Sequence, residues 1–282
     1  MTDLLKSMLG GLARFVLAWL LPVAVGVGLF WAVCVPVLAQ AKTGSLLTGA
    51  SSGGTDGRGG IEALGLAAFA TLTVSTLLAY ASQLIYRVLE GYHLPPSIDR
   101  RWTTAQRKRH ARLAATESAL ERSSYGKRSK RYGLVHEQLG LYPQSRDLIM
   151  PTRLGNALKT LEGYGQDRFG LDSQQFWFEL IGTAQDTVRR ETEEARAQVD
   201  LFVASVTAFS LLSLLSTAVG VLYSRSGPVL LGVVSALIVP LAYRSAVRNM
   251  KDWNNSVRAM VNLGRIPVAE SLGGCSPAQT LG

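Results

Sequence analysis

The sequence predicts an all-α integral membrane protein, with four transmembrane helices arranged as two hairpins and a helical cytoplasmic domain between them. Two observations predict this fold class. Four apolar stretches carry almost no charge, and each has about the length that a bilayer core requires. The charged residues, 17% of the 282, gather between these stretches. The predicted parts are a cytoplasmic N-terminus at 1–14, a span at 15–39, an external loop at 40–60, a span at 61–87, a basic helical cytoplasmic domain at 88–198, a span at 199–223, an external turn at 224–227, a span at 228–245 and a cytoplasmic tail at 246–282.

The first span has flanks that would also suit a signal peptide. Lys6 and Arg14 precede it, and Ala39-Gln40-Ala41 at its end resembles a small-residue cleavage site. Its apolar run, however, is longer than the about 7–15 residues of a signal-peptide core. We therefore expect this segment to be retained as a span, and cleavage is the alternative.

The other three spans carry charge only at their edges. Glu62 lies at the outer edge of the second span, and Asp200 lies at the start of the third. Ionisable residues inside a membrane usually mark proton or ion pathways, so this pattern argues against a proton-coupled transporter. The fourth span is the shortest and contains Pro240, so it either tilts little or continues into the residues that follow.

The distribution of basic residues predicts the orientation. The two connections between paired spans contain only Lys42, Arg58 and Arg225 as basic residues. By contrast, residues 100–131 contain eleven Lys or Arg and two Glu, a net charge equal to the +9 of the whole chain. Because cytoplasmic loops are enriched in Lys and Arg, we expect a multi-pass protein of the cell membrane with both termini inside.

A basic helix is predicted from Arg100 to about Arg122, since Ala, Arg, Leu and Glu dominate and no helix breaker occurs. Its cations suit anionic lipid headgroups, because each Lys or Arg near a membrane surface contributes about 1 kcal/mol. The alternative is a solvated face that only sets the topology. Nucleic acid is the least favoured partner, since no recognition motif accompanies the charge. The candidate headgroup contacts are Arg100, Arg101, Arg107, Lys108, Arg109 and Arg112.

Turn residues divide the remainder of the cytoplasmic domain. The helix of the second span is expected to end at Glu90, shortly before two consecutive prolines. A short helix is expected to start at Pro151-Thr152 and to end near Gly163, with a loop at 165–172.

Asp172 is a candidate N-cap, with Gln175 three residues later as in a capping box. The helix that it opens is predicted to run without interruption into the third span, and it is our candidate element for transmitting a change to the membrane. Its apolar stripe consists of Trp177, Ile181, Ala184 and Val188. The tail after the fourth span has a similar stripe, interrupted by Asn254, and is expected to pack along the membrane or against the middle domain.

Several segments together resemble a known group of proteins. They are Leu89-Glu90-Gly91-Tyr92, Pro151-Thr152-Arg153-Leu154-Gly155-Asn156, Arg168-Phe169-Gly170-Leu171-Asp172 and the tail from Trp253 to Leu263. From about Ile85 onward the chain resembles a group of bacterial four-span membrane proteins with a segment of the Pro-Thr-Arg-Leu-Gly-Asn type. The resemblance implies the same topology, and it implies no activity because none is known for the group.

The sequence contains no HExxH, P-loop or GxSxG motif and no cysteine and histidine cluster with metal-site spacing. His93, His110 and His136 are scattered, and a lone histidine is more often a surface residue than a catalyst. Asp167 and Asp172 share a predicted loop, in which capping and turn roles are the favoured explanation. We therefore expect no enzyme, no cofactor and no metal site.

The spans do contain small and weakly polar residues at intervals of four. In the second span this candidate stripe consists of Thr71, Ser75, Ala79 and Gln83. Such stripes allow helices to approach closely, which is the favoured interpretation. In a ring of subunits, the same stripe could instead line a narrow pore.

These observations support three functional hypotheses. The first is a membrane-anchored regulatory, sensory or effector protein that acts through its cytoplasmic helical domain on an unknown protein partner. The alternative is a homo-oligomeric ion channel or pore, and a homo-oligomer is expected. A membrane-embedded enzyme ranks last, because no nucleophile, acid–base pair or metal site converges. The subunit count separates the first two, since a four-helix bundle without charged lining offers no path for water.

Overall fold

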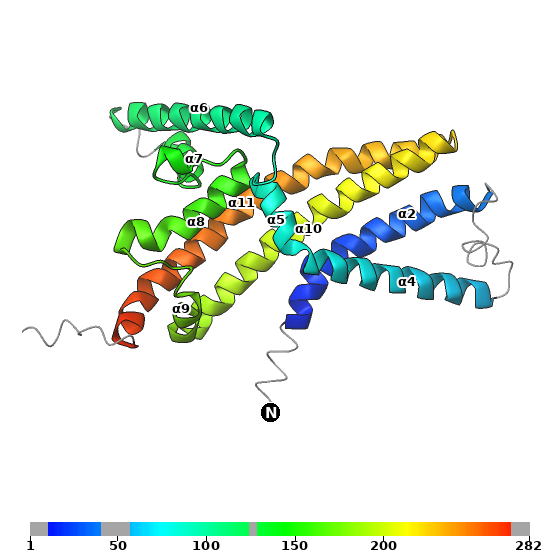
Figure 1. The fold of residues 1–282 in the computed structure, drawn as a ribbon, viewed down its shortest axis with the longest axis horizontal. Helices are drawn as coiled ribbons and strands as arrows, with labels where there is room; N and C mark the ends of the chain where they lie inside the picture. Colours follow the sequence, from blue (N-terminus) through cyan, green and yellow to red (C-terminus); the bar gives the residue numbers. More distant parts are fainter. Residues whose placement is uncertain (1–10, 41–56, 124–128, 272–282) are drawn as a thin grey trace, which may run out of the picture. The chain divides into compact units, whose positions relative to one another are not determined.

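The computed structural model describes residues 11–40, 57–123 and 129–271. Within these ranges the regular structure is entirely helical (Figure 1). The chain divides into two compact units. Unit 1 comprises Met1–Ile85 and Ala197–Ala246, and unit 2 comprises Tyr86–Arg196 and Val247–Gly282. Most of the predicted loop at 40–60 and the ends of the chain lie outside the described residues, and a helix already begins at Gly57.

The first described helix of unit 1 starts at Gly11 and contains a π-helical turn, η1 (Val16–Leu20), that leads into α2 (Leu21–Gln40). The wide turn is closed by the backbone N–H of Leu21, which donates to the carbonyl of Val16. Pro22 follows directly, has no N–H to donate and crowds the carbonyl four residues before it, which explains why the helix widens here. The first predicted span is therefore helical throughout.

The second predicted span is bent. It consists of α4 (Gly57–Tyr80) and α5 (Ser82–Glu90), whose axes differ by 58°. The predicted span at 61–87 therefore stays a prediction and corresponds to a bent helix pair, whereas the predicted helix end at Glu90 is confirmed.

Two long helices complete unit 1 and extend beyond it. They are α10 (Asp186–Leu222) and α11 (Ser226–Ser271). Three helical segments are long and apolar enough to cross a membrane, namely Gly11–Gln40, Asp186–Leu222 and Ser226–Glu270, and the bent pair would add a fourth. Of the two alternatives for the fourth span, the helix does continue into the residues that follow, because α11 runs unbroken through Pro240.

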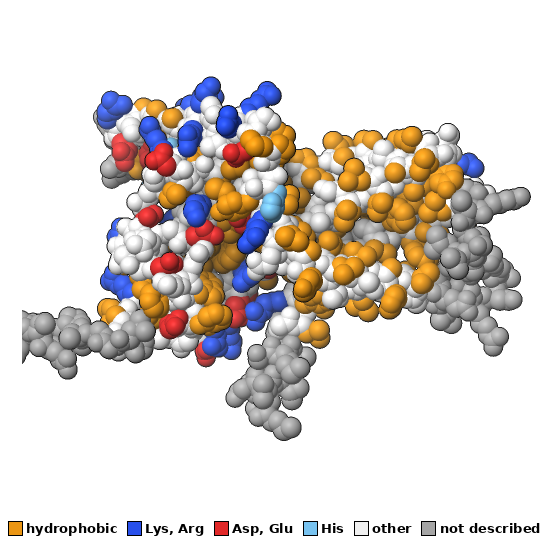
Figure 2. Space-filling view, in the orientation of Figure 1, with side chains coloured by type: hydrophobic (Ala, Val, Ile, Leu, Met, Phe, Trp, Pro, Cys, Tyr) orange, Lys and Arg blue, Asp and Glu red, His pale blue; other side chains and the backbone are white. Residues whose placement is uncertain are grey.

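The surface of unit 1 suits lipid better than water. Large apolar side chains such as Leu64, Phe69, Leu214 and Leu237 are each more than 60% exposed. Figure 2 shows hydrophobic side chains covering the part of the surface formed by these helices, whereas charged side chains gather on unit 2. Soluble proteins rarely expose apolar patches of this extent, so the surface supports a membrane protein.

Small residues let the helices of unit 1 pack closely. A Cβ at Gly232 of α11 would meet the backbone of Thr217 in α10 at 3.0 Å. The Cys34 thiol of α2 donates to the Ser216 hydroxyl of α10 over 3.5 Å, and both side chains are buried. Close helix approach of this kind is common in membrane bundles.

Unit 2 is a helical domain. Its elements are α6 (Pro96–Glu121), α7 (Lys130–Leu139), the 3-10 turn η3 (Arg146–Leu148), α8 (Arg153–Phe169), α9 (Trp177–Thr183), the start of α10 and the second half of α11. The expected basic helix is α6. Ser129 caps α7 by accepting a hydrogen bond from the Tyr132 backbone N–H.

The expected end of α8 was wrong, since the helix continues past Gly163 to Phe169. Gly165 does not break it because its missing side chain makes room for the returning chain: a Cβ there would lie 2.6 Å from the Leu171 carbonyl oxygen. The helix ends at Gly170, which adopts the left-handed conformation with φ 66° that favours glycine. Asp167 therefore lies on α8 and not in a loop.

The predicted uninterrupted helix from Asp172 into the third span was also wrong. Asp172 is not the N-cap of this helix, because α9 begins at Trp177 with Phe176 at the N-cap position, and it ends at Thr183. The Asp172 carboxylate instead accepts hydrogen bonds from the backbone N–H groups of Gln174 and Gln175 in the turn before the helix. Ala184 is extended, with ψ 142°, and α10 begins two residues later. Asp186 stabilises the new N-terminus and pairs with Arg189 at 2.7 Å.

The tail packs within unit 2. Met250, Val257 and Val261 of α11 are buried, as the apolar stripe predicts. Asn254, which interrupts the stripe, is also buried and donates from Nδ2 to the Ala157 carbonyl of α8 over 3.4 Å. The alternative in which the tail packs against the middle domain is therefore confirmed.

Candidate functional site

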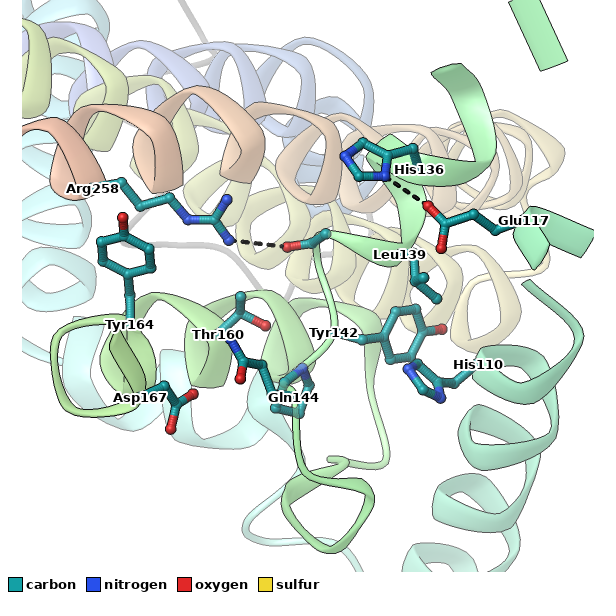
Figure 3. Close-up of a pocket in the computed structure, with 12 residues that line it drawn as sticks. His110, Glu117, His136, Leu139, Tyr142, Gln144, Thr160, Tyr164, Asp167 and Arg258 are labelled. Carbon is teal, nitrogen blue, oxygen red and sulfur yellow. Dashed lines mark hydrogen bonds and ion pairs between the residues drawn. The ribbon is translucent and has the colours of Figure 1, made fainter. Parts of the chain in front are cut away.

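Unit 2 contains a cavity of about 290 Å³ between four helices (Figure 3). Its polar lining comes from α6, α7, the loop after α7, α8 and α11. The lining residues with polar or aromatic side chains are His110, Glu117, His136, Tyr142, Gln144, Thr160, Tyr164, Asp167 and Arg258. The cavity therefore combines acidic, basic and aromatic groups.

A histidine and a glutamate form one end of the cavity. His136 Nδ1 of α7 lies 2.6 Å from Glu117 Oε1 of α6. The His136 ring also stacks on Tyr132, whose hydroxyl donates to Glu121 of α6 over 3.0 Å. The hydrogen bond to Glu121 raises the pKa of the Tyr132 hydroxyl. These polar contacts hold α6 against α7.

Arg258 and Tyr164 form the opposite end (Figure 3). The guanidinium carbon of Arg258 lies 5.2 Å from the Tyr164 ring centroid, a cation–π distance. Nη2 of Arg258 donates to the Gly140 carbonyl over 3.4 Å, and the Tyr164 hydroxyl donates to Asn262 over 3.0 Å. The α11 side chain is thus held between α8 and the end of α7.

His110 lies beside the cavity in a partly buried position. Its ring is tilted against Tyr142, with centroids 5.3 Å apart, and the Tyr142 hydroxyl donates to Gln106 over 2.8 Å. Burial, together with the positive charge of Arg146, lowers the pKa of His110. We therefore expect His110 to be neutral at pH 7. Two buried nitrogens at this cavity, His110 Nδ1 and Arg258 Nε, have no hydrogen-bond partner within the described structure.

Helix α8, which supplies three lining residues, is fixed at its N-terminus to the end of α5. The Thr152 hydroxyl donates to the Glu90 carbonyl over 3.0 Å and accepts from the Gly155 backbone N–H over 2.9 Å. A Cβ at Gly155 would lie 2.5 Å from the Glu90 carbonyl oxygen. Gly91 has φ 100°, which L side chains rarely adopt, and contacts Pro151. We call this junction of Glu90, Gly91, Thr152 and Gly155 the α5–α8 joint.

Asn156 completes this local structure. Its side-chain oxygen accepts from the Met150 backbone N–H over 2.8 Å, and its amide donates to the Met150 and Thr152 carbonyls over 2.9 and 2.7 Å. A buried amide with its hydrogen bonds satisfied holds the preceding loop in one conformation. The Pro-Thr-Arg-Leu-Gly-Asn segment therefore has a structural explanation at Thr152, Gly155 and Asn156.

The predicted headgroup contacts all lie on α6. Arg100, Arg101, Arg107, Lys108 and Arg112 are exposed. Arg109 is half-buried and donates from Nη2 to the Gln138 side chain of α7 over 3.1 Å. Five of the six are thus available to a partner, whereas Arg109 belongs to the contact between α6 and α7.

The predicted stripe of the second span is divided by the bend. Ser75 is fully buried and Thr71 half-buried, and their hydroxyls donate to carbonyls of their own helix at 2.6 and 2.8 Å. Ala79 packs against the buried cluster of Ala18, Trp19 and Ala204, whereas Gln83 lies on α5 and is exposed. Pore lining by this stripe stays a prediction.

Sequence reasoning treated the histidines as scattered, yet the fold brings His110 and His136 to one cavity with Glu117, Asp167 and Arg258. These residues come from four helices with no shared spacing, so no local pattern predicts their meeting. His93 is exposed outside this cavity. No group of three or more metal-ligating side chains occurs in the part of the chain that the structure describes.

Comparisons of the chain with protein-family models, with curated proteins and with solved structures find no match.

Proposed function

We propose that this chain is a membrane-anchored regulatory or sensory protein, whose helical unit 2 binds a small polar molecule in the cavity beside His136 and Arg258. The observation that carries the proposal is the mixed polar lining, contributed by four helices of one domain. A volume of about 290 Å³ lies near the lower end of the range for ligand sites, which is about 300–1,000 Å³. This size favours a small metabolite over a nucleotide or a peptide.

The unpaired nitrogens at the cavity support a binding role. Buried polar atoms without a partner each raise the free energy of the native state by about 1–3 kcal/mol, and native interiors contain few of them. His110 Nδ1 and Arg258 Nε lie at the same cavity. An occupant that shifts these side chains into hydrogen bonds would recover part of that cost.

Two connections suit the transmission of such a change. The helix that supplies Arg258 is α11, which is continuous from Ser226 to Ser271 and includes an apolar segment long enough to cross a membrane. The helix that supplies Thr160, Tyr164 and Asp167 is α8, which the α5–α8 joint fixes to α5. In this proposal α8 and α11, and not the interrupted α9–α10 segment, transmit the change to the membrane. Unit 2 and both termini face the cytoplasm.

A thermal-shift screen of the full chain in lipid nanodiscs tests the binding role. The probes are single amino acids, short dicarboxylates and small polyols, each at millimolar concentration. A compound that binds the native state at about 100 times its Kd stabilises it by about 2.7 kcal/mol, so a rise in Tm is expected for at least one probe class. The rise should disappear in Arg258→Gln and in Tyr164→Phe.

Lys251→Gln is the matched control, because Lys251 also lies on α11 but pairs with Glu137 at 3.0 Å and is not part of the cavity lining. A probe that stabilises all four proteins equally acts elsewhere on the chain. If no probe class raises the Tm of the wild type, the cavity is a structural feature of the helix packing and the proposed function is wrong.

A further inference from the structure

Helix α6 has more basic than acidic side chains. Of its three acidic residues, Glu117 and Glu121 contact His136 and Tyr132 of α7, and Asp99 accepts a hydrogen bond from the Thr103 hydroxyl over 3.3 Å. The exposed basic side chains of the helix are Arg100, Arg101, Arg107, Lys108 and Arg112. Figure 2 shows Lys and Arg side chains along the outer surface of α6. None of the residues of this helix is buried, so its outer face is a surface that the rest of the described unit 2 leaves uncovered.

The first turns of α6 form a shallow basic hollow on this face. Its lining consists of Ser97, Arg100, Arg101, Thr104, Ala105 and Lys108. Arg100, Thr104 and Lys108 follow at intervals of four and therefore lie along one ridge of the helix. The Thr104 hydroxyl donates to the Arg100 carbonyl of its own helix over 2.7 Å. The three cations and the Ser97 hydroxyl match the oxygens of a phosphate group in charge and in hydrogen bonding. We call this hollow the basic cradle.

The chain connects the basic cradle closely to an apolar helix pair. Only residues 91–95 separate the end of α5 from the start of α6, so the two ends lie within about 20 Å. The connection is folded as a turn, with the Leu94 backbone N–H 3.4 Å from the Gly91 carbonyl, which shortens this reach further. Because α4 and α5 together are long and apolar enough to cross a membrane, the cradle begins within reach of a bilayer surface.

Aromatic and apolar side chains near the cradle also suit such a surface. Tyr92 and Trp102 are about half exposed, at 56% and 48%, and Ile98 is 39% exposed. Tyr and Trp are enriched where a membrane meets water, since their rings are apolar and their N–H or O–H groups are polar. Basic and aromatic residues thus occur together over a short stretch of chain.

We propose that the basic cradle binds the phosphate of an anionic membrane lipid, with Arg100, Arg101 and Lys108 as the cations and Ser97 as a hydroxyl donor. This site is independent of the cavity in unit 2 and does not rest on the proposed function. Binding of a lipid phosphate would fix the first turns of α6 at the bilayer surface.

The experiment is a lipid titration of the full chain in detergent micelles, with bound lipids counted by native mass spectrometry. The probes are phosphatidylglycerol, phosphatidylcholine with the same acyl chains, and soluble glycerol phosphate. The wild type is compared with the triple variant Arg100→Gln, Arg101→Gln, Lys108→Gln. Its control is Lys130→Gln, Arg131→Gln, Arg190→Gln, which removes the same charge from exposed positions outside the cradle.

We expect the cradle variant to bind phosphatidylglycerol roughly a hundredfold more weakly, since each surface cation contributes about a fivefold factor in affinity. The control variant should change the affinity less than threefold, and phosphatidylcholine should bind weakly to all three proteins. Gln favours helices and no replaced side chain is buried, so circular dichroism should show unchanged helix content.

Three outcomes would overturn the proposal. Equal losses in both triple variants would mean that only net charge attracts the lipid. Unchanged phosphatidylglycerol binding in the cradle variant would place the lipid elsewhere. Glycerol phosphate bound by the cradle as tightly as the lipid would make the occupant a free phosphate compound and not a bilayer.

Discussion

Two helices of unit 2, α6 and α8, are held by opposite means. The longer one, α6, has 26 residues, and none of them is buried. The shorter one, α8, has 17 residues, of which Leu154, Gly155, Asn156, Ala157, Leu158 and Gly165 are buried. Polar side chains hold α6 in place, whereas close backbone contact and apolar burial hold α8. Polar contacts at a surface contribute little net free energy, so α6 is the part of unit 2 that is able to move at low cost.

The strongest test of this contrast is Gly155→Ala. The new Cβ would lie 2.5 Å from the Glu90 carbonyl oxygen and 3.0 Å from the Thr152 hydroxyl, so the α5–α8 joint has to open. We expect a loss of about 3 kcal/mol or more in the free energy of unfolding, measured by thermal or denaturant unfolding of the full chain in detergent.

Gly133→Ala in α7 is the matched control, because nothing lies within 4 Å of the position that its Cβ would take. This replacement should stabilise the protein by about 0.5–1 kcal/mol, since Ala favours a helix interior more than Gly. Equal changes in the free energy of unfolding for the two replacements would show that the α5–α8 joint accommodates the new side chain at no cost. Helix α8 would then be no more firmly held than α6.

Asn156→Ala is expected to have the next largest effect. The replacement removes the partner of the Met150 N–H and of two carbonyls in a partly buried loop. We expect a loss of about 2 kcal/mol, measured by the same unfolding experiment. Thr160→Ala, further along α8, removes a hydroxyl that donates to a carbonyl of its own helix, and it should cost less than 1 kcal/mol. A larger cost for Thr160→Ala would contradict the assignment of Asn156 as the side chain that fixes the loop.

The contrast also explains which parts of the fold were predictable. Helices set by composition, such as α6, and ends set by proline or glycine, such as Glu90, are visible in the sequence. The end of α8 was predicted too early because glycine ends many helices. Here Gly165 instead makes room for Leu171, which lies outside the helix. The break at Ala184 contains no proline, and the apolar stripe continues across it. The sequence therefore did not indicate that the helix ends there. The residues of the cavity were unpredictable as a set, since their proximity depends on how α6, α7, α8 and α11 pack.

A smaller effect is expected for Tyr142→Phe, which tests how α6 is held. The replacement removes the hydroxyl that donates to Gln106 of α6 over 2.8 Å and keeps the buried ring. The cost should be about 1 kcal/mol. Hydrogen exchange, read by mass spectrometry, should become faster in α6 and stay unchanged in α8. Faster exchange in both helices would mean that unit 2 opens as one cooperative unit and that α6 does not move alone.

The smallest effect is expected for His110→Gln, which should change how the stability of the protein depends on pH. The pKa of His110 is lowered in the folded protein by burial and by the charge of Arg146, so the unfolded chain binds more protons around and below pH 6.5. The neutral His110 ring therefore contributes its full stability to the folded protein well above pH 6.5. This contribution falls as the pH decreases through 6.5 toward the lowered pKa of the folded protein. The difference in Tm between pH 7.5 and pH 5.5 should accordingly be smaller in His110→Gln than in the wild type.

His93→Gln serves as the control, because His93 is exposed, and it should keep the wild-type difference. An unchanged difference in His110→Gln would show that acid acts on unit 2 through other groups, and His110 would then have no part in holding α6.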